Sequence, residues 1–417
     1  MAVANTYGDA QNTIGTLNGL FKDVYAEKLK NAVPDQVKIM TAIKFSGKEA
    51  QLGGNFNQPV ILQLEHGITF ASTDQDAFAL APAIAGAIRN AQIKGCPAVL
   101  RSVIGYAAAS RSSHSSSAFE EATKYLVANM MRSMAKKLET EMLYGQVGYG
   151  TVNGALTTTS LAITVTTSEW APGIFAGAEG MPIEVRSADG LTSRGTATIT
   201  GVSFENRSVT LGSAIVGMVD GDVLWHGGAY GNEFIGVHGV LTKQTGLLFN
   251  INCAQFNLFR GNQYSAQNGA LSFAKLQLAA ARAVEKGLDS KLTVFCNPRA
   301  WANMMSDQAA LRRYDQSFSK SKLDNGASAL EFDSQNGVLA IVPSIFVKEG
   351  YAYMLSLDDW SRVGSSDMSF KRSGHEGDYF RDLDSAAGYE LRLYTDQAVF
   401  CSAPAKSVVI TNIVNQS

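Results

Sequence analysis

The cysteines and histidines of this chain are too far apart in the sequence to form a recognisable metal or redox motif. Cys96, Cys253, Cys296 and Cys401 include no Cys-x-x-Cys pair, and the five histidines are equally scattered. Structural zinc sites usually take their ligands from closely spaced pairs. The pattern therefore predicts four reduced, mostly buried thiols, as in a protein that folds in a cytoplasm, and no metal site.

Three further segments carry residue types that catalysis uses, but not at the spacing that it needs. Gly148–Gly154 is glycine-rich but lacks the Gly-Lys-Ser/Thr ending of a phosphate-binding loop. Residues 377–388 hold three aspartates without the ligand pattern of a calcium loop. Residues 110–117 combine serine and histidine without an acid to orient the histidine. The sequence thus predicts a protein that is not an enzyme and has no catalytic residue, cofactor or metal.

The composition is that of a globular protein. Of the 417 residues, 46% are hydrophobic and 17% are charged, which is enough apolar material for about two or three domains. The formal net charge is −2, which argues against a dedicated binder of nucleic acid or of an anionic membrane. It is compatible with a container that surrounds nucleic acid. No signal peptide or membrane span is recognisable.

A long helix is predicted over residues 113–145. Ser117 and Glu120 have the spacing of a capping box, and apolar residues repeat at three- and four-residue intervals along the segment. Gly145 is expected to end the helix. From Ala118 to Tyr144 such a helix would be about 40 Å long, which suits a strut across a flat plate, although a core helix of an α/β enzyme remains an alternative.

Residues 45–112 are predicted to form a long hairpin arm. An alternating run places Val60, Leu62 and Leu64 on one face, and a second extended run follows at residues 98–112. The segment between the two runs is irregular. Two strands of a central sheet would give the same alternation, so that alternative stays open.

Residues 150–232 predict a separate β domain. Five or six short β-patterned runs, punctuated by turns such as Asp-Gly, describe a small barrel or sandwich. Helix and strand then alternate, with a helix at 271–287, a buried strand at 291–296 and a second helix opened by Asn297-Pro298. The predicted fold class is therefore α+β with an inserted small all-β domain.

This order of elements resembles the major capsid proteins of tailed double-stranded DNA bacteriophages, the Hong Kong 97 type. The resemblance rests on a long helix ending in MLYG, a helix-strand-NPRAW unit and a closing AKSVVITNI strand. It implies the following division of the chain: an N-terminal arm (1–44), an extended loop (45–112), the spine helix of a peripheral domain (113–149), an inserted β-barrel-like domain (150–232), a peripheral/axial connection (233–269), an axial domain (270–375) and return strands of the peripheral domain (376–417).

The resemblance also implies a function. The chain would assemble with itself, as hexamers and pentamers, into the icosahedral shell around the double-stranded DNA of a virion, formed in the bacterial cytoplasm. A separate scaffolding protein, a portal and possibly a decoration protein would be its partners, without a membrane or sequence-specific DNA binding. The residues expected at the assembly interface are Val60, Leu62, Leu64, Phe70, Arg101 and Arg111. Aspartate at Leu62 and Leu64 is expected to block assembly without unfolding the subunit.

Three other functions are alternatives to this one. An encapsulin-type cargo shell would have the same fold, but the β insertion and the 417-residue length count against it. A cytosolic α/β enzyme would need a convergent polar site, and no acid, base or nucleophile stands out. A phage tail or adhesion protein would explain the Thr/Gly-rich β segment but not the long helix and the NPRAW unit.

One departure from the family pattern concerns covalent cross-linking. In the founding member of the family, a lysine of the extended loop attacks an asparagine of a neighbouring subunit. This chain has no asparagine between Gly337 and Thr411, where the acceptor would lie. A shell held by non-covalent contacts alone is therefore expected.

Overall fold

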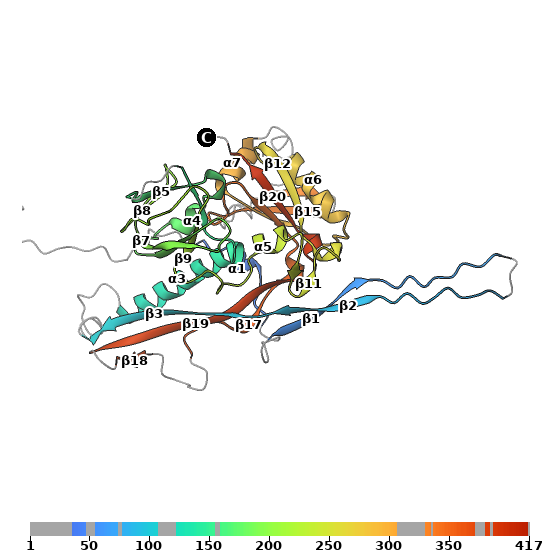
Figure 1. The fold of residues 1–417 in the computed structure, drawn as a ribbon, viewed down its shortest axis with the longest axis horizontal. Helices are drawn as coiled ribbons and strands as arrows, with labels where there is room; N and C mark the ends of the chain where they lie inside the picture. The colour runs from blue at the N-terminus through green and yellow to red at the C-terminus, as the bar shows by residue number, and fades with distance from the viewer. Residues whose placement is uncertain are drawn as a thin grey trace, which may run out of the picture.

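The computed structural model describes residues 36–46, 55–73, 77–106, 122–154, 159–306, 330–334, 337–371, 380–383 and 387–415. Figure 1 shows a body built on two sheets, with a barrel on one side and a long arm that projects from the other. Most of the expected N-terminal arm, the capping residues Ser117 and Glu120, and Arg111 lie outside the described residues.

The predicted long helix is present as α3 (Ala122–Tyr144), which lies along a four-stranded sheet (Figure 1). Its strands are β3 (Cys96–Gly105), β17 (Trp360–Ser369), β18 (Phe380–Asp382) and β19 (Gly388–Cys401). The long strand β19 pairs antiparallel with β3 on one edge and with β17 and β18 on the other. On α3, the buried residues Met130, Met134, Leu138 and Met142 recur every fourth position, as a helix with one covered face requires.

Gly145 follows the helix for a different reason from the one predicted. The residue with left-handed backbone after α3 is Gln146, with φ of 62°, and not Gly145. A Cβ atom on Gly145 would lie 2.1 Å from the carbonyl oxygen of Phe234. Glycine is therefore required by the close approach of a second backbone, a demand that the local sequence does not show.

The second sheet has six strands in the order β12-β20-β16-β13-β15-β14. They are β12 (Asn262–Gly269), β13 (Thr293–Cys296), β14 (Leu330–Ser334), β15 (Gly337–Pro343), β16 (Ala352–Leu355) and β20 (Val408–Ile413). Three helices accompany them: α5 (Val237–Thr242), α6 (Phe273–Val284) and α7 (Pro298–Ser306). The predicted cap of α7 is confirmed, because the Asn297 side chain accepts a hydrogen bond from Arg299 N at 3.0 Å.

Two strands lie in a different sheet from the one that the predicted division implies. β20 was expected with the return strands of the peripheral domain, but it lies between β12 and β16 in the six-stranded sheet. Conversely, β17 was expected in the axial domain and pairs with β19. An apolar run such as Val408–Ile410, buried throughout, identifies a central strand but not its neighbours.

Within residues 150–232, six strands close into a barrel in the order β4-β5-β8-β7-β6-β9. They are β4 (Gly150–Asn153), β5 (Ala162–Val165), β6 (Pro182–Arg186), β7 (Ser193–Ser203), β8 (Ser208–Leu211) and β9 (Val223–His226). The barrel interior belongs to the same continuous cluster of buried side chains as α3 and the four-stranded sheet. An independently folding domain at 150–232 therefore stays a prediction.

The arm is a hairpin of β1 (Phe56–Gln63) and β2 (Ala87–Ile93), paired antiparallel (Figure 1). The predicted partner of the first strand is wrong, because residues 98–105 belong to β3 and pair with β19. Most of β2 is exposed on both faces, so it has little alternation by which the sequence could indicate it. Among the described residues, no helix is both long and apolar enough to span a membrane.

Candidate assembly surfaces

The arm exposes an unusual number of large apolar side chains. They are Ile61, Leu64, Ile68, Phe70, Phe78, Leu80, Ile84 and Ile88, with exposed fractions from 45% at Phe78 to 91% at Phe70. Ile61 of β1 lies directly opposite Ile88 of β2, so these two contribute to one face. Contiguous exposed apolar surface of this kind marks a site of contact with another molecule.

The predicted interface residues of the arm divide into two groups. Leu64 and Phe70 are exposed, at 71% and 91%. Leu62 is only 9% exposed and packs in the subunit's own core, and Val60 is partly buried against it. The base of the arm docks here, where Gln92 N donates to the Phe249 carbonyl at 2.9 Å. Leu62 therefore serves the subunit itself, and its exposed neighbour Ile61 takes its place on the candidate surface.

Arg101 lies on the open face of the four-stranded sheet. Its side chain is 60% exposed, and Nη2 lies 2.8 Å from Oε2 of Glu390. Arg392, directly opposite Arg101 in the register, binds the same carboxylate. Hydrogen bonds from Arg392 and Arg101 lower the pKa of Glu390. Arg101 thus neutralises a carboxylate within the subunit and still leaves 60% of its side chain exposed.

A pocket of about 860 Å³ lies between α3, β3 and the barrel, and it contains a cluster of titratable groups. Lys137 Nζ lies 2.5 Å from Glu233 Oε1 and donates to the Tyr149 hydroxyl at 2.9 Å. Glu141, one turn further along α3, is 5% exposed. Burial raises the pKa of Glu141 to about 7. The cluster holds the chain near Glu233 against α3. In the sequence, only the four-residue spacing of Lys137 and Glu141 indicates that these two side chains lie on one face of the helix.

This pKa makes stability depend on pH. Between pH 4.5 and about 7 the folded chain keeps a proton on Glu141 that the unfolded chain loses, so the free energy of unfolding should fall by up to about 3 kcal/mol as the pH rises. Urea unfolding at pH 5 and pH 7 measures this, and Glu141→Gln should remove most of the difference. Glu179→Gln, at an exposed carboxyl of the same pocket, is the control. A pH dependence unchanged in Glu141→Gln would contradict the assignment.

A second buried carboxylate on α3 anchors the segment before the arm. Glu139 is fully buried and accepts backbone hydrogen bonds from Lys38, Ile39 and Met40, at 3.1, 2.9 and 2.7 Å. These N–H groups open the short helix α1 (Ile39–Ala42), so the carboxylate satisfies donors that the helix leaves free. No local pattern in the sequence indicates this role of Glu139, because the donors are about one hundred residues away.

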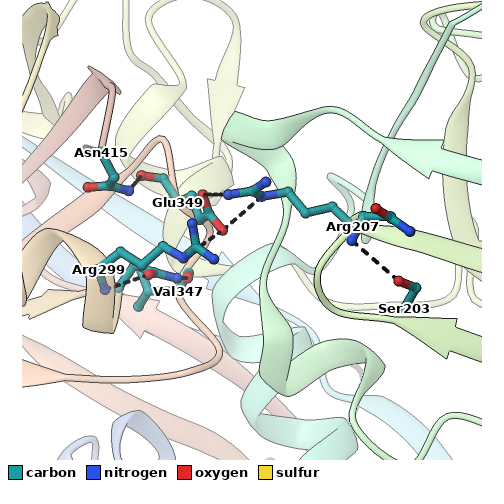
Figure 2. Close-up of polar contacts among 8 residues, drawn as sticks. Ser203, Arg207, Arg299, Val347, Glu349 and Asn415 are labelled. Atoms are coloured by element: carbon teal, nitrogen blue, oxygen red, sulfur yellow. Dashed lines mark hydrogen bonds and ion pairs between the residues drawn. The ribbon is translucent and has the colours of Figure 1, made fainter. Parts of the chain in front are cut away.

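The barrel is joined to the body by Glu349, which is 3% exposed. Figure 2 shows the Arg207 guanidinium, from the turn between β7 and β8, aligned with this carboxylate, with two N–O distances of 3.1 Å. Arg299 of α7 approaches the same carboxylate at 3.7 Å, and Asn415 donates to the Glu349 carbonyl at 3.0 Å. A two-point arginine–carboxylate contact sets direction as well as distance, so it orients the barrel on the body.

The neighbouring residue, Lys348, makes a second buried link. It is 1% exposed, and its Nζ lies 2.5 Å from Glu169 Oε2 and donates to the Gly148 carbonyl at 3.1 Å. The Tyr351 hydroxyl donates to the other oxygen of Glu169 at 2.6 Å. Although burial alone raises the pKa of Glu169, the Lys348 ammonium brings it below its ordinary value.

The described residues contain no group of three or more His, Cys, Asp or Glu that could hold a metal ion.

No protein-family model and no curated protein sequence matches this chain. Solved structures do match it. The capsid asymmetric unit of Cyanophage A-1(L) has a TM-score of 0.55 and 11% identity, over 95% of this chain and 98% of that one. The capsid of a native GTA particle has a TM-score of 0.54 and 9% identity, over 97% and 100%. An encapsulin of Synechococcus elongatus has a TM-score of 0.46 and 9% identity, over 97% and 96%.

These likenesses extend over nearly the whole of each chain, although the sequences are almost unrelated. The two capsid structures, with TM-scores above 0.5, share the overall fold of this chain. This chain therefore has the Hong Kong 97-type capsid fold.

Proposed function

We propose that this chain is the major capsid protein of a tailed bacteriophage, which assembles with itself into the shell around the double-stranded DNA. The observation that carries the proposal is the arm: a hairpin with eight exposed large apolar side chains, on a capsid fold. A two-stranded hairpin that buries so little of its own surface is marginally stable in water. A neighbouring copy would cover it and stabilise it.

Repeated contacts of one surface with a different surface of the next copy generate closed rings where the rotation between copies closes. Arms that lie over neighbours in this way would link copies into hexamers and pentamers, and these into a closed shell. A net charge of −2 suits a container whose wall must let DNA slide during packaging. A scaffolding protein and a portal would guide assembly in the bacterial cytoplasm, and a decoration protein could bind the finished virion.

Negative-stain electron microscopy of the protein, expressed with its neighbouring genes, tests the proposal. Closed polyhedral shells that contain DNA would support it. Small discrete oligomers would overturn it. Closed shells that contain a protein cargo instead of DNA would support an encapsulin.

The arm should change its protection on assembly. Because few of its side chains are covered in the single subunit, backbone amides of β1 and β2 should exchange with solvent quickly in the free protein. In the shell, where a neighbour covers them, the same amides should exchange slowly. Hydrogen–deuterium exchange with mass spectrometry measures both states. Equal protection in the two states would mean that no neighbour covers the arm.

The shell should contain no covalent cross-link between chains, because no asparagine lies at the acceptor position. Mature particles boiled in detergent should release one band near the 44.5 kDa of the single chain. A ladder of oligomers that resists reductant would contradict this expectation.

A further inference from the structure

The two ends of the barrel differ in what they face. Because every pair of neighbouring strands is antiparallel, the chain passes alternately between the two ends. One end holds the turn with Arg207, which binds Glu349, and so faces the body. The opposite end holds residues 159–161, which precede β5, and the connections at 187–192 and 212–222.

The connections at this far end expose aliphatic side chains. Leu161, Leu191, Val216 and Val219 have exposed fractions of 45, 79, 68 and 50%. Within the last connection, Ile215 and Met218 are only 4% and 5% exposed. This connection therefore buries two of its apolar residues and exposes the other two, Val216 and Val219. Because the connection is packed against the barrel, the exposure of these two valines does not result from a loosely packed loop.

The same end exposes two acidic groups. Asp189 and Asp220 are exposed, and no ion pair forms with either within the described residues. The nearby Asp222 is instead paired with Arg194 at 3.1 Å. We call this surface the barrel tip; it comprises Leu161, Leu191, Val216, Val219, Asp189 and Asp220.

A surface of opposite charge lies on α6 and the adjoining 3₁₀ turn η3 (Asn257–Phe259). We call it the cationic face; it comprises Leu258, Leu278, Arg260, Arg282 and Lys286. Its two leucines are 54% and 58% exposed. Like the barrel tip, it therefore exposes aliphatic side chains as well as charged groups.

The cations of this face are poorly neutralised. Arg260 and Lys286 share one neutral acceptor, Asn257 Oδ1, at 2.8 and 3.4 Å. Arg282 lies over the Tyr264 ring, and none of the three cations has a carboxylate within ion-pair distance in the part of the chain described here. The Arg260 Nε atom is buried without an acceptor there.

One nearby carboxylate partly offsets this charge. Glu285, the exposed C-cap residue of α6, lies next to Lys286 in the sequence and adds one negative charge to this region. Burial and the charges of Arg260 and Arg282 lower the pKa of Lys286, as expected where cations crowd together. Three cations against one carboxylate leave an excess of positive charge on the face.

The two surfaces lie on opposite sides of the body: Figure 1 shows the barrel strands at the left and α6 at the right. Complementary surfaces on opposite sides of one chain allow head-to-tail contact, which gives a ring where the rotation from one copy to the next closes. We propose that the barrel tip of one copy packs against the cationic face of the next copy. The aliphatic side chains would meet in the centre, with Asp189 and Asp220 opposite the cations. This inference rests on the proposed function and adds to it the two surfaces by which neighbouring copies in one ring would touch.

A pair of substitutions at Val216 separates this contact from loss of apolar surface alone. Val216→Arg and Val216→Glu remove the same aliphatic group, but only the arginine opposes the cationic face. We expect the yield of shells to be at least about ten-fold lower for Val216→Arg than for Val216→Glu. Adding Arg282→Glu to Val216→Arg should restore the yield. Equal yields for the two single variants would overturn the contact, provided that urea unfolding shows both subunits to be equally folded.

Cysteine cross-linking tests the contact without relying on yield. A chain with both Val216→Cys and Leu278→Cys should give, on mild oxidation, a ladder of oligomers that reductant collapses to one band. Each single variant should give no ladder beyond a dimer. Shells without this ladder would overturn the contact and leave the proposed function standing. If the wild type forms no shell at all, the proposed function fails. If, in addition, the double-cysteine variant gives no ladder in solution, the contact is overturned as well.

Discussion

Replacing Ile61 with aspartate should abolish the formation of closed shells, while the free energy of unfolding of the subunit changes by less than about 1 kcal/mol. Ile61 is 68% exposed and lies opposite Ile88, so a charge there enters the apolar face of the arm without disturbing the subunit's core. Burying an unpaired carboxylate beneath a neighbour is strongly unfavourable. Electron microscopy and urea unfolding of the same preparation measure the two effects.

Two other residues of the same strand are the controls. Leu62→Asp should lower the free energy of unfolding of the isolated subunit by about 2 kcal/mol or more, because Leu62 is 9% exposed and packs in the core. Asn57→Asp adds the same charge at an exposed polar position of β1 and should still assemble. Normal shells from Ile61→Asp would show that no neighbour covers this face.

Replacing Glu169 with leucine should lower the free energy of unfolding by about 4 kcal/mol. The change leaves the Lys348 ammonium, 1% exposed, without its carboxylate partner at 2.5 Å. It also removes the acceptor of the Tyr351 hydroxyl. A buried charge without a partner costs far more than the ion pair itself contributes, so the loss should exceed that from any exposed ion pair of the chain. Urea unfolding of the subunit at pH 7 measures it.

The double variant Glu169→Leu with Lys348→Met distinguishes an unpaired charge from lost packing. If the unpaired ammonium causes the loss, removing it as well should recover at least half of the lost free energy. Lys406→Met is the matched control for a surface pair, because its partner Asp289 is 79% exposed and its loss should be nearly neutral. A double variant no more stable than the single one would show that the ion pair is not the reason.

The elements with a strong internal pattern could be predicted from the sequence. Helix α3 follows from apolar residues that recur every three or four positions, and α7 follows from the Asn297-Pro298 opening. The short strands β5 to β9 follow from β-patterned runs separated by turn residues, whereas β4 lies in a glycine-rich segment that indicated a loop. In each case the residues that determine the element are neighbours in the sequence, so the information is local.

Strand partners were decided by the tertiary structure alone. Alternation identified β1 as a strand, but its partner is β2, and residues 98–105 pair with β19 nearly three hundred residues away. β20 likewise joins the six-stranded sheet and not the sheet of β19. Strands are joined by backbone groups that every residue carries, so the side-chain pattern shows which face is buried but not which strand lies alongside.

Which residues of the candidate surfaces the sequence could predict depends on the same limit, because a side-chain pattern shows a covered face but not what covers it. The alternation at Val60–Leu64 indicated a covered face, and the sequence could not show whether the subunit's own core or a neighbour covers it. The structure assigns Leu62 to the core and leaves Ile61, Leu64 and Phe70 exposed. Glu349 and Arg207 were not predicted because they are 142 residues apart and have no local signature. A buried ion pair needs two groups at one point in space, and only the folded chain places them there.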